Sequence, residues 1–261
     1  MPKTVWLAFP YPDKAFDQAG AALKKNWPRL HRGDCEPFPR TAAVQDAWRA
    51  YHAGDFGKAV ALGLAAGLAG TNVANKAAMI YATYLEDDDG KKLGLLQEVA
   101  QRAESLQAAE PDNVNAWYYH AYALGRYSQG ISVGKALAQG LGGKIKASLE
   151  RTIALAPQHA DAHIALGAWH AEIIDKVGGM MGGLTYGARK ESGEKHFRTA
   201  LELNPDSAIA RTEMANGLVM MFGRSRMKEA EALYAQAAAA VPADAMERLD
   251  VEAARAELDD G

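Results

Sequence analysis

The chain has 261 residues, of which 49% are apolar and 23% are charged, and its formal net charge is −3. This composition fits a soluble protein or repeat array and lacks the strongly basic balance of many nucleic-acid-binding proteins. Its single cysteine, Cys35, excludes an internal disulfide, and we find neither the long apolar stretch of a signal peptide nor an apolar run long enough to span a membrane. We therefore expect a cytoplasmic protein whose partners include no nucleic acid and no membrane.

Residues 1–40 form the first predicted segment. They contain six of the ten prolines together with aromatic side chains such as Trp6, Phe9 and Trp27. Such a stretch is too apolar to remain disordered. We expect it to pack on the helices that follow and to cover the first of them.

Four isolated prolines divide the rest of the chain. Each follows a stretch rich in apolar residues, and each precedes a residue that can cap a new helix. The prolines are Pro111, Pro157, Pro205 and Pro242, and the expected caps are Asp112, Asp161, Ser207 and Asp244. Since proline cannot continue a helix, each proline predicts a helix end followed by a helix start. Their spacing of 46, 48 and 37 residues indicates a structural repeat.

Apolar residues between these prolines follow helical spacing. Ala162, Leu166 and Trp169, for example, share one face of a helix. We expect each unit to be two antiparallel helices that bury their apolar faces by stacking on neighbouring units. The predicted units lie near 41–71, 72–111, 112–157, 158–205 and 206–242, with a capping helix in 243–261. Residues 41–261 would then form one repeat domain.

The fourth unit carries the most informative residues of this pattern. They are Ala162-His163-Ile164-Ala165-Leu166-Gly167, followed by Phe197, Ala200, Leu201 and Pro205. With Gly54-Asp55-Phe56 and Ala116-Trp117-Tyr118-Tyr119, they resemble tetratricopeptide repeats (TPRs), whose period is about 34 residues. The resemblance implies an all-α fold, an α-α superhelix or TPR-like solenoid of about five helical hairpins plus a C-terminal capping helix.

The third and fourth units exceed this period by about 12 and 14 residues, and the excess lies between their two helices. These inserts, residues 128–143 and 176–192, are rich in glycine. The surrounding stretches are Leu124-Gly125-Arg126-Tyr127, Ala162 to Trp169, and Ala200-Leu201-Glu202-Leu203-Asn204-Pro205. They resemble the repeat region of the regulator of microtubule dynamics family and its bacterial relatives. A second resemblance is to the TPR component associated with TRAP dicarboxylate transporters. Both imply a helical adaptor.

One face of the third unit is the main candidate binding site. Tyr118, Tyr122 and Arg126 are spaced four residues apart, so they share one helix face, and exposed Tyr and Arg are typical anchors. In the TPR register this face lines the concave groove, although packing between repeats is an alternative interpretation. The predicted partner-binding residues are Asn115, Tyr118, Tyr122, Arg126, Asp161 and Asn216. We expect a protein or peptide partner, or a partner helix, and a monomer or weak homodimer.

The inserts raise a different function. If they fold over one another, they would close a pocket for a small molecule, and their cations would favour an anionic ligand. The residues predicted to line it are Lys135, Lys144, Met180, Met181, Tyr186 and Arg189.

Histidines in the fourth unit are the remaining candidates for chemistry. His159, His163 and His170 lie close enough in sequence to meet on adjacent turns, as metal ligands do. In the repeat register His163 and His170 occupy core positions, so we expect buried packing residues. No spacing pairs Cys35 with a base, and Gly142-Gly143-Lys144 lacks the remaining residues of a phosphate loop. We expect no enzyme, no metal and no cofactor.

Overall fold

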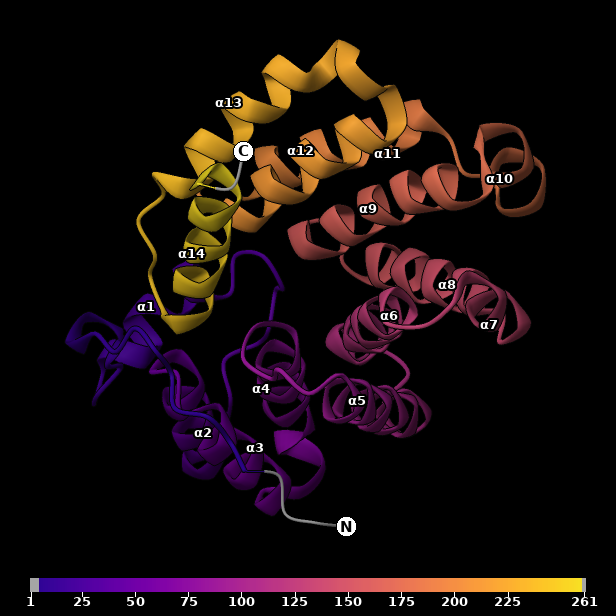
Figure 1. Cartoon of the computed structure of the whole chain (residues 1–261). Coiled ribbons are helices and arrows are strands. Elements are labelled where there is room, and N and C mark those ends of the chain that lie inside the picture. The colour runs from indigo at the N-terminus through magenta and orange to yellow at the C-terminus, as the bar shows by residue number, and fades with distance from the viewer. Residues whose placement is uncertain (1–4, 260–261) are drawn as a thin grey trace. The chain divides into compact units, whose positions relative to one another are not determined.

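A computed structural model describes residues 5–259, and within that range every regular element is helical (Figure 1). The first six α-helices are α1 Ala22–Leu30, α2 Ala42–His52, α3 Phe56–Ala65, α4 Thr71–Tyr84, α5 Asp89–Ala109 and α6 Val114–Gln129. The others are α7 Val133–Ala138, α8 Leu141–Leu155, α9 Ala160–Val177, α10 Gly179–Tyr186, α11 Lys190–Leu203, α12 Ala208–Phe222, α13 Met227–Ala238 and α14 Ala245–Asp259. The predicted fold class, an all-α TPR-like array of helical hairpins with a C-terminal helix, is confirmed.

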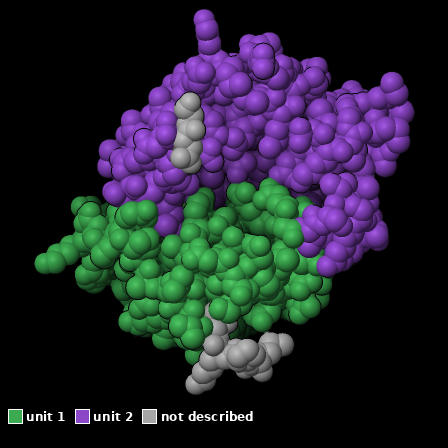
Figure 2. Space-filling view, in the orientation of Figure 1, with its two compact units in different colours: residues 1–30, 36–130, 243–246 green, residues 31–35, 131–242, 247–261 purple. Residues whose placement is uncertain are grey.

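The chain divides into two compact units, shown in green and purple in Figure 2. Unit 1 contains the chain up to residue 30, residues 36–130 and residues 243–246. Unit 2 contains residues 31–35, residues 131–242 and the chain from residue 247. The third predicted hairpin is thereby divided, because α6 belongs to unit 1 and α8 to unit 2. The division expected from the sequence, a segment of residues 1–40 before one repeat domain, stays a prediction.

Unit 1 is organised around α4. This helix packs on α2 and α6, the first helices of the neighbouring hairpins, and also on α3 and α5. Its apolar core includes the fully buried side chains of Trp48, Tyr51, Phe56 and Tyr81. Aromatic residues therefore supply much of the buried apolar surface between these helices.

The beginning of the described chain lies against these helices. The amide of Leu7 donates a hydrogen bond of 3.1 Å to the hydroxyl of Tyr81, and the ring of Trp6 lies 4.5 Å from the ring of Tyr81. The ring of Phe9 lies 6.3 Å from that of Phe56 on α3. These contacts bury aromatic surface that would otherwise face water.

Unit 2 contains two complete hairpins, α9 with α11 and α12 with α13. Helix α9 packs on both α11 and α12, and glycines allow this close approach: the fully buried ring of Phe197 on α11 lies directly against Gly167 on α9 and Gly217 on α12. Helix α14 shares a buried cluster with α12 and α13 through Val251 and Ala254. The last helix therefore covers the apolar end of this unit.

The prolines mark helix ends as expected, but the caps differ in part. Ser207 caps α12, and its Oγ accepts a hydrogen bond of 3.1 Å from the amide of Ala210. Helix α6 is capped by Asn113 instead of Asp112, and α9 by the ring of His159 instead of Asp161. In both cases the cap lies two residues beyond the proline because a turn separates the two helices.

The two inserts contain short helices of their own. Helix α7 lies in the first insert and packs on α8, and α10 lies in the second insert and packs on α9 (Figure 1). Positive φ angles at Gly140, Gly178 and Gly187 allow the chain to turn at the ends of these helices. Three of the insert glycines therefore serve the turn after α7 and the turns on both sides of α10.

Candidate functional site

Three side chains stack along one face of α6, as their spacing predicts. The ring of Tyr118 lies 6.3 Å from that of Tyr122, and the guanidinium of Arg126 lies 5.4 Å from the centre of the Tyr122 ring. The hydroxyl of Tyr122 is 3.1 Å from Oγ1 of Thr83 on α4. Tyr118 is buried, whereas Tyr122 and Arg126 are half-buried. The part of this face that is accessible to a partner therefore lies mainly at Tyr122 and Arg126, and Nη1 of Arg126 also donates a hydrogen bond of 3.2 Å to Oε1 of Gln129.

A buried polar cluster at the start of α6 engages Asn115. Its Nδ2 donates a hydrogen bond of 2.6 Å to Oε2 of Glu36, and Nδ2 of Asn72 on α4 lies 3.0 Å from the same oxygen. Asn115 is only 1% exposed. Glu36 of the same chain thus binds the side-chain amide of Asn115. No sequence pattern pointed to Glu36, because it lies 79 residues before Asn115.

Asp161 and Asn216 lie in unit 2 and also contact the chain itself. The amide of Asp161 donates a hydrogen bond of 3.0 Å to the carbonyl oxygen of Gly33, and the Asp161 carboxylate packs directly over the Gly33 Cα. Beside them, the guanidinium of Arg32 lies 3.0 Å from the carboxylate of Asp206. The side-chain oxygen of Asn216 accepts a hydrogen bond from the hydroxyl of Tyr234. The arrangement of all six predicted residues around one groove stays a prediction.

The inserts of unit 2 meet at Tyr186. Its ring packs against Gly142 at the start of α8, and its carbonyl oxygen accepts a hydrogen bond of 3.0 Å from Nζ of Lys146. Nε1 of Trp169 on α9 donates to the carbonyl oxygen of Gly142 at 2.9 Å. Among the predicted pocket residues, those with exposed side chains are Lys135, Lys144, Met180, Met181 and Arg189. An enclosed pocket between the inserts stays a prediction.

Three buried or half-buried histidines gather between α9 and α11. His163 and His170 on α9 are buried, and His196 on α11 is half-buried. The Nδ1 atoms of His163 and His196 are 2.9 Å apart, and the rings of His170 and His196 are stacked at 6.0 Å. Burial is the main reason why the pKa of all three lies below its usual value of 6.5. Over residues 5–259, no three His, Cys, Asp or Glu side chains form a group that could hold a metal ion.

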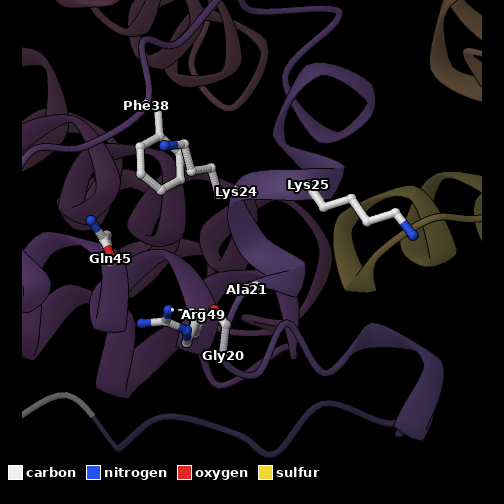
Figure 3. A pocket seen from close by; sticks show the side chains of 7 residues that line it. All are labelled: Gly20, Ala21, Lys24, Lys25, Phe38, Gln45 and Arg49. Carbon is white, nitrogen blue, oxygen red and sulfur yellow. Dashed lines mark hydrogen bonds between the residues drawn. The ribbon is translucent and has the colours of Figure 1, made fainter.

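A surface pocket lies in unit 1, between α1 and the start of α2 (Figure 3). Its cationic lining residues are Lys24, Lys25 and Arg49. The guanidinium of Arg49 is already engaged: Nε donates to the carbonyl oxygen of Gln18, and Nη1 lies 2.7 Å from the carboxylate of Asp46. The two lysines therefore provide most of the pocket's available positive charge.

Comparisons with known proteins support the fold. A thermophilic TPR protein of Thermus thermophilus, known from its crystal structure, is similar with a TM-score of 0.57 and 18% sequence identity. The match covers 82% of this chain and 97% of the Thermus chain. No family model matches the sequence, and no curated protein matches it. Within the described part of the chain, no helix is both long and apolar enough to cross a bilayer.

Proposed function

We propose that this protein is a non-catalytic scaffold that binds a protein partner, presented as a peptide or a helix, at the exposed part of the α6 face. TPR-like folds commonly serve as protein-interaction scaffolds, and the long third and fourth hairpins resemble adaptor proteins of the regulator of microtubule dynamics family. The observation that carries the proposal is the stack of Tyr122 and Arg126.

This stack has the properties of a binding anchor. Thr83 fixes the hydroxyl of Tyr122, and Tyr122 in turn holds the guanidinium of Arg126 over its ring. Both side chains therefore lose little conformational freedom when a partner binds, which reduces the entropic cost of association. Tyr and Arg are also the residue types that contribute most per residue at protein interfaces. The guanidinium favours a partner that presents a carboxylate or backbone carbonyls at this position.

The test is affinity capture from the native cell extract with the Tyr122→Ala/Arg126→Ala variant beside the wild type. The matched control is Tyr11→Ala/Arg40→Ala, which removes an exposed Tyr and Arg elsewhere in unit 1. We expect a captured protein that is lost from the α6 variant and kept by the control. An α6 variant that retains the full set of captured proteins, with an unchanged circular dichroism spectrum, would show that this face is not the site.

A second candidate function is binding of a small anionic molecule. The sequence suggested a pocket beside the inserts 128–143 and 176–192, and the pocket of Figure 3 offers Lys24 and Lys25 in unit 1 as a different location. Citrate and inorganic phosphate are suitable probes. Binding at this pocket predicts a rise in melting temperature that Lys24→Gln/Lys25→Gln removes, since a ligand that binds only the folded state stabilises it. If the melting temperature of the variant still rises with the ligand, the ligand binds elsewhere. If neither citrate nor phosphate raises the melting temperature of the wild type, this candidate function is wrong.

A further inference from the structure

Charge is distributed unevenly between the inserts and the rest of the chain. The inserts, together with Lys144 just after the first of them, contain five cations and one carboxylate; the cations are Lys135, Lys144, Lys176, Arg189 and Lys190, and the carboxylate is Glu191. Lys176 also pairs with Glu172 at 2.9 Å. The remaining 24 Lys and Arg residues face 31 Asp and Glu residues, which leaves the rest of the chain at a formal charge of −7. The inserts are therefore a basic region on an otherwise acidic protein.

The same inserts carry large apolar side chains on their outer surface. Met180 and Leu184 on α10 are 79% and 80% exposed, and Met181 between them is 57% exposed. On α7, Val133 and Leu137 are also exposed. Exposed apolar groups next to cations occur where a surface is covered by an amphipathic partner or by the interfacial region of a bilayer.

Contacts within unit 2 hold the two inserts together. Tyr186, the last residue of α10, packs against Gly142. Gly142 is the second residue of α8, which follows α7 after the turn at Gly140. Nζ of Lys146 on α8 binds the carbonyl oxygen of Tyr186. The exposed cations Lys135, Lys144 and Arg189 therefore belong to one basic and apolar region, which we call the insert surface; it consists of α7, α10 and the chain between α7 and α8.

We propose that the insert surface docks on a lipid bilayer that contains anionic lipids. Helices α7 and α10 have six and eight residues, too few to span a bilayer, so their contact with it is limited to the interface. Side chains that are about 80% exposed project outward, and a fluid layer accepts them without a preformed pocket. A protein partner would need a cavity shaped for each of them. This proposal departs from the expectation, drawn from overall composition, that no membrane is a partner.

The two kinds of side chain have separate roles in this proposal. The cations attract the protein to the negative surface potential of the bilayer, an effect that salt screens. The methionines and Leu184 then enter the boundary between headgroups and acyl chains, and their removal from water stabilises the bound state. The net negative charge of the rest of the chain favours an orientation in which the insert surface faces the bilayer.

Co-sedimentation of the purified full chain with vesicles tests the proposal. One set of vesicles is phosphatidylcholine alone, and in the other about a third of the lipid is phosphatidylglycerol, which supplies the negative surface potential. We expect binding to the anionic vesicles at low salt, little binding to the neutral ones, and release at high salt. The variant Lys135→Gln/Lys144→Gln should weaken binding by roughly fivefold for each charge removed.

A second variant, Met180→Ser/Leu184→Ser, tests insertion and should abolish sedimentation. Because both side chains are largely exposed, we expect its fold and melting temperature to be unchanged. The matched control is Val241→Ser, which removes an apolar side chain that is 84% exposed but lies outside the inserts, and it should bind as the wild type does.

Three results would overturn the proposal. They are no sedimentation with the anionic vesicles, equal sedimentation with neutral and anionic vesicles, and wild-type sedimentation of Met180→Ser/Leu184→Ser. The first would leave the insert surface as a contact for an acidic protein. The α6 variant Tyr122→Ala/Arg126→Ala should sediment with the anionic vesicles as the wild type does, so the membrane proposal and the scaffold proposal can fail independently.

Discussion

The Nδ1 atoms of His163 and His196 lie 2.9 Å apart and join α9 to α11. Nε2 of His163 faces the carbonyl oxygen of Pro157 at 3.0 Å, and because a carbonyl only accepts, His163 carries its proton on Nε2. When His163 is neutral, its Nδ1 therefore accepts, and Nδ1 of His196 donates. If both rings carried two protons, two N–H groups would face each other, so the contact requires that at least one of the two histidines is neutral.

We predict that His196, together with its stacked neighbour His170, makes the fold sensitive to acid. Burial, helped by the nearby His163 and Lys195, lowers the pKa of His196 to about 4. Burial, helped by the nearby His196 and Lys146, lowers the pKa of His170 to about 4 as well. In the unfolded state both histidines have the ordinary pKa of 6.5. As the pH falls from 6.5 toward 4, the unfolded state therefore binds protons before the folded state does. The folded state therefore has its full stability above pH 6.5 and loses stability as the pH falls toward 4. The loss in the free energy of unfolding is on the order of 1 kcal/mol per histidine after allowance for solvent screening.

Urea titrations at several pH values measure this effect. The variant His196→Gln keeps a side-chain hydrogen-bond donor but does not titrate, so its free energy of unfolding should vary less steeply over the same pH range. The prediction is wrong if the wild type and His196→Gln show the same pH dependence.

Replacement of Glu36 by Ala should destabilise unit 1. Its carboxylate accepts hydrogen bonds from Nδ2 of both Asn72 and Asn115, and Asn115 is almost completely buried. Removing the acceptor takes a hydrogen-bond partner from each of two buried amides, at a cost of about 1–3 kcal/mol in the free energy of unfolding. Chemical denaturation monitored by circular dichroism measures the loss.

Glu98→Ala is the matched control for that experiment. Glu98 pairs with Arg102 along α5 at 3.5 Å; the Glu98 side chain is 47% exposed and that of Arg102 is 23% exposed. Exposed pairs contribute little, so this variant should lose less than about 1 kcal/mol. Equal losses for Glu36→Ala and Glu98→Ala would contradict the role assigned to Glu36.

Glycines that face Phe197 should not tolerate a methyl group. A Cβ on Gly167 would lie 2.9 Å from the Phe197 ring, and a Cβ on Gly217 would meet the same ring from α12. Because Phe197 is fully buried and cannot move away, Gly167→Ala and Gly217→Ala should each cost about 1–3 kcal/mol of stability. Gly125→Ala in α6 is the control: its Cβ would meet no atom within 4 Å, so it should stabilise the helix by about 0.5–1 kcal/mol. The same sign for all three variants in thermal unfolding would refute this assignment.

Cys35 should react slowly with alkylating reagents. Burial, together with the negative charges of Asp34 and Asp161, raises the pKa of its thiol from 9.0 to about 11. Since the thiolate is the nucleophile, alkylation at pH 8 should be about 100-fold slower in the folded chain than in urea. Mass spectrometry of iodoacetamide-treated samples over time gives both rates, and similar rates would show that the folded thiol is accessible and ionised normally.

Sequence patterns predicted the helices well because helix ends and apolar spacing are local properties. Pro205 and the cap Ser207 are two residues apart, and the spacing of Tyr118 and Tyr122 is set by a single helix. The contacts of Glu36 with Asn115 and of Gly33 with Asp161 join residues that no local pattern relates. For that reason sequence reasoning assigned Asn115 and Asp161 to a partner, while the structure shows each in contact with the chain's own segment.

Both compact units are assembled from discontinuous stretches. Arg32 pairs with Asp206 in unit 2, and Nδ1 of His52 lies 2.7 Å from the carboxylate of Asp244 in unit 1. Repeat arrays normally complete each repeat as it is made, because contacts form between neighbours. Here neither unit has all of its residues until the chain has been synthesised beyond residue 242. Arg32 and His52 therefore lack these partners until Asp206 and Asp244 have been synthesised.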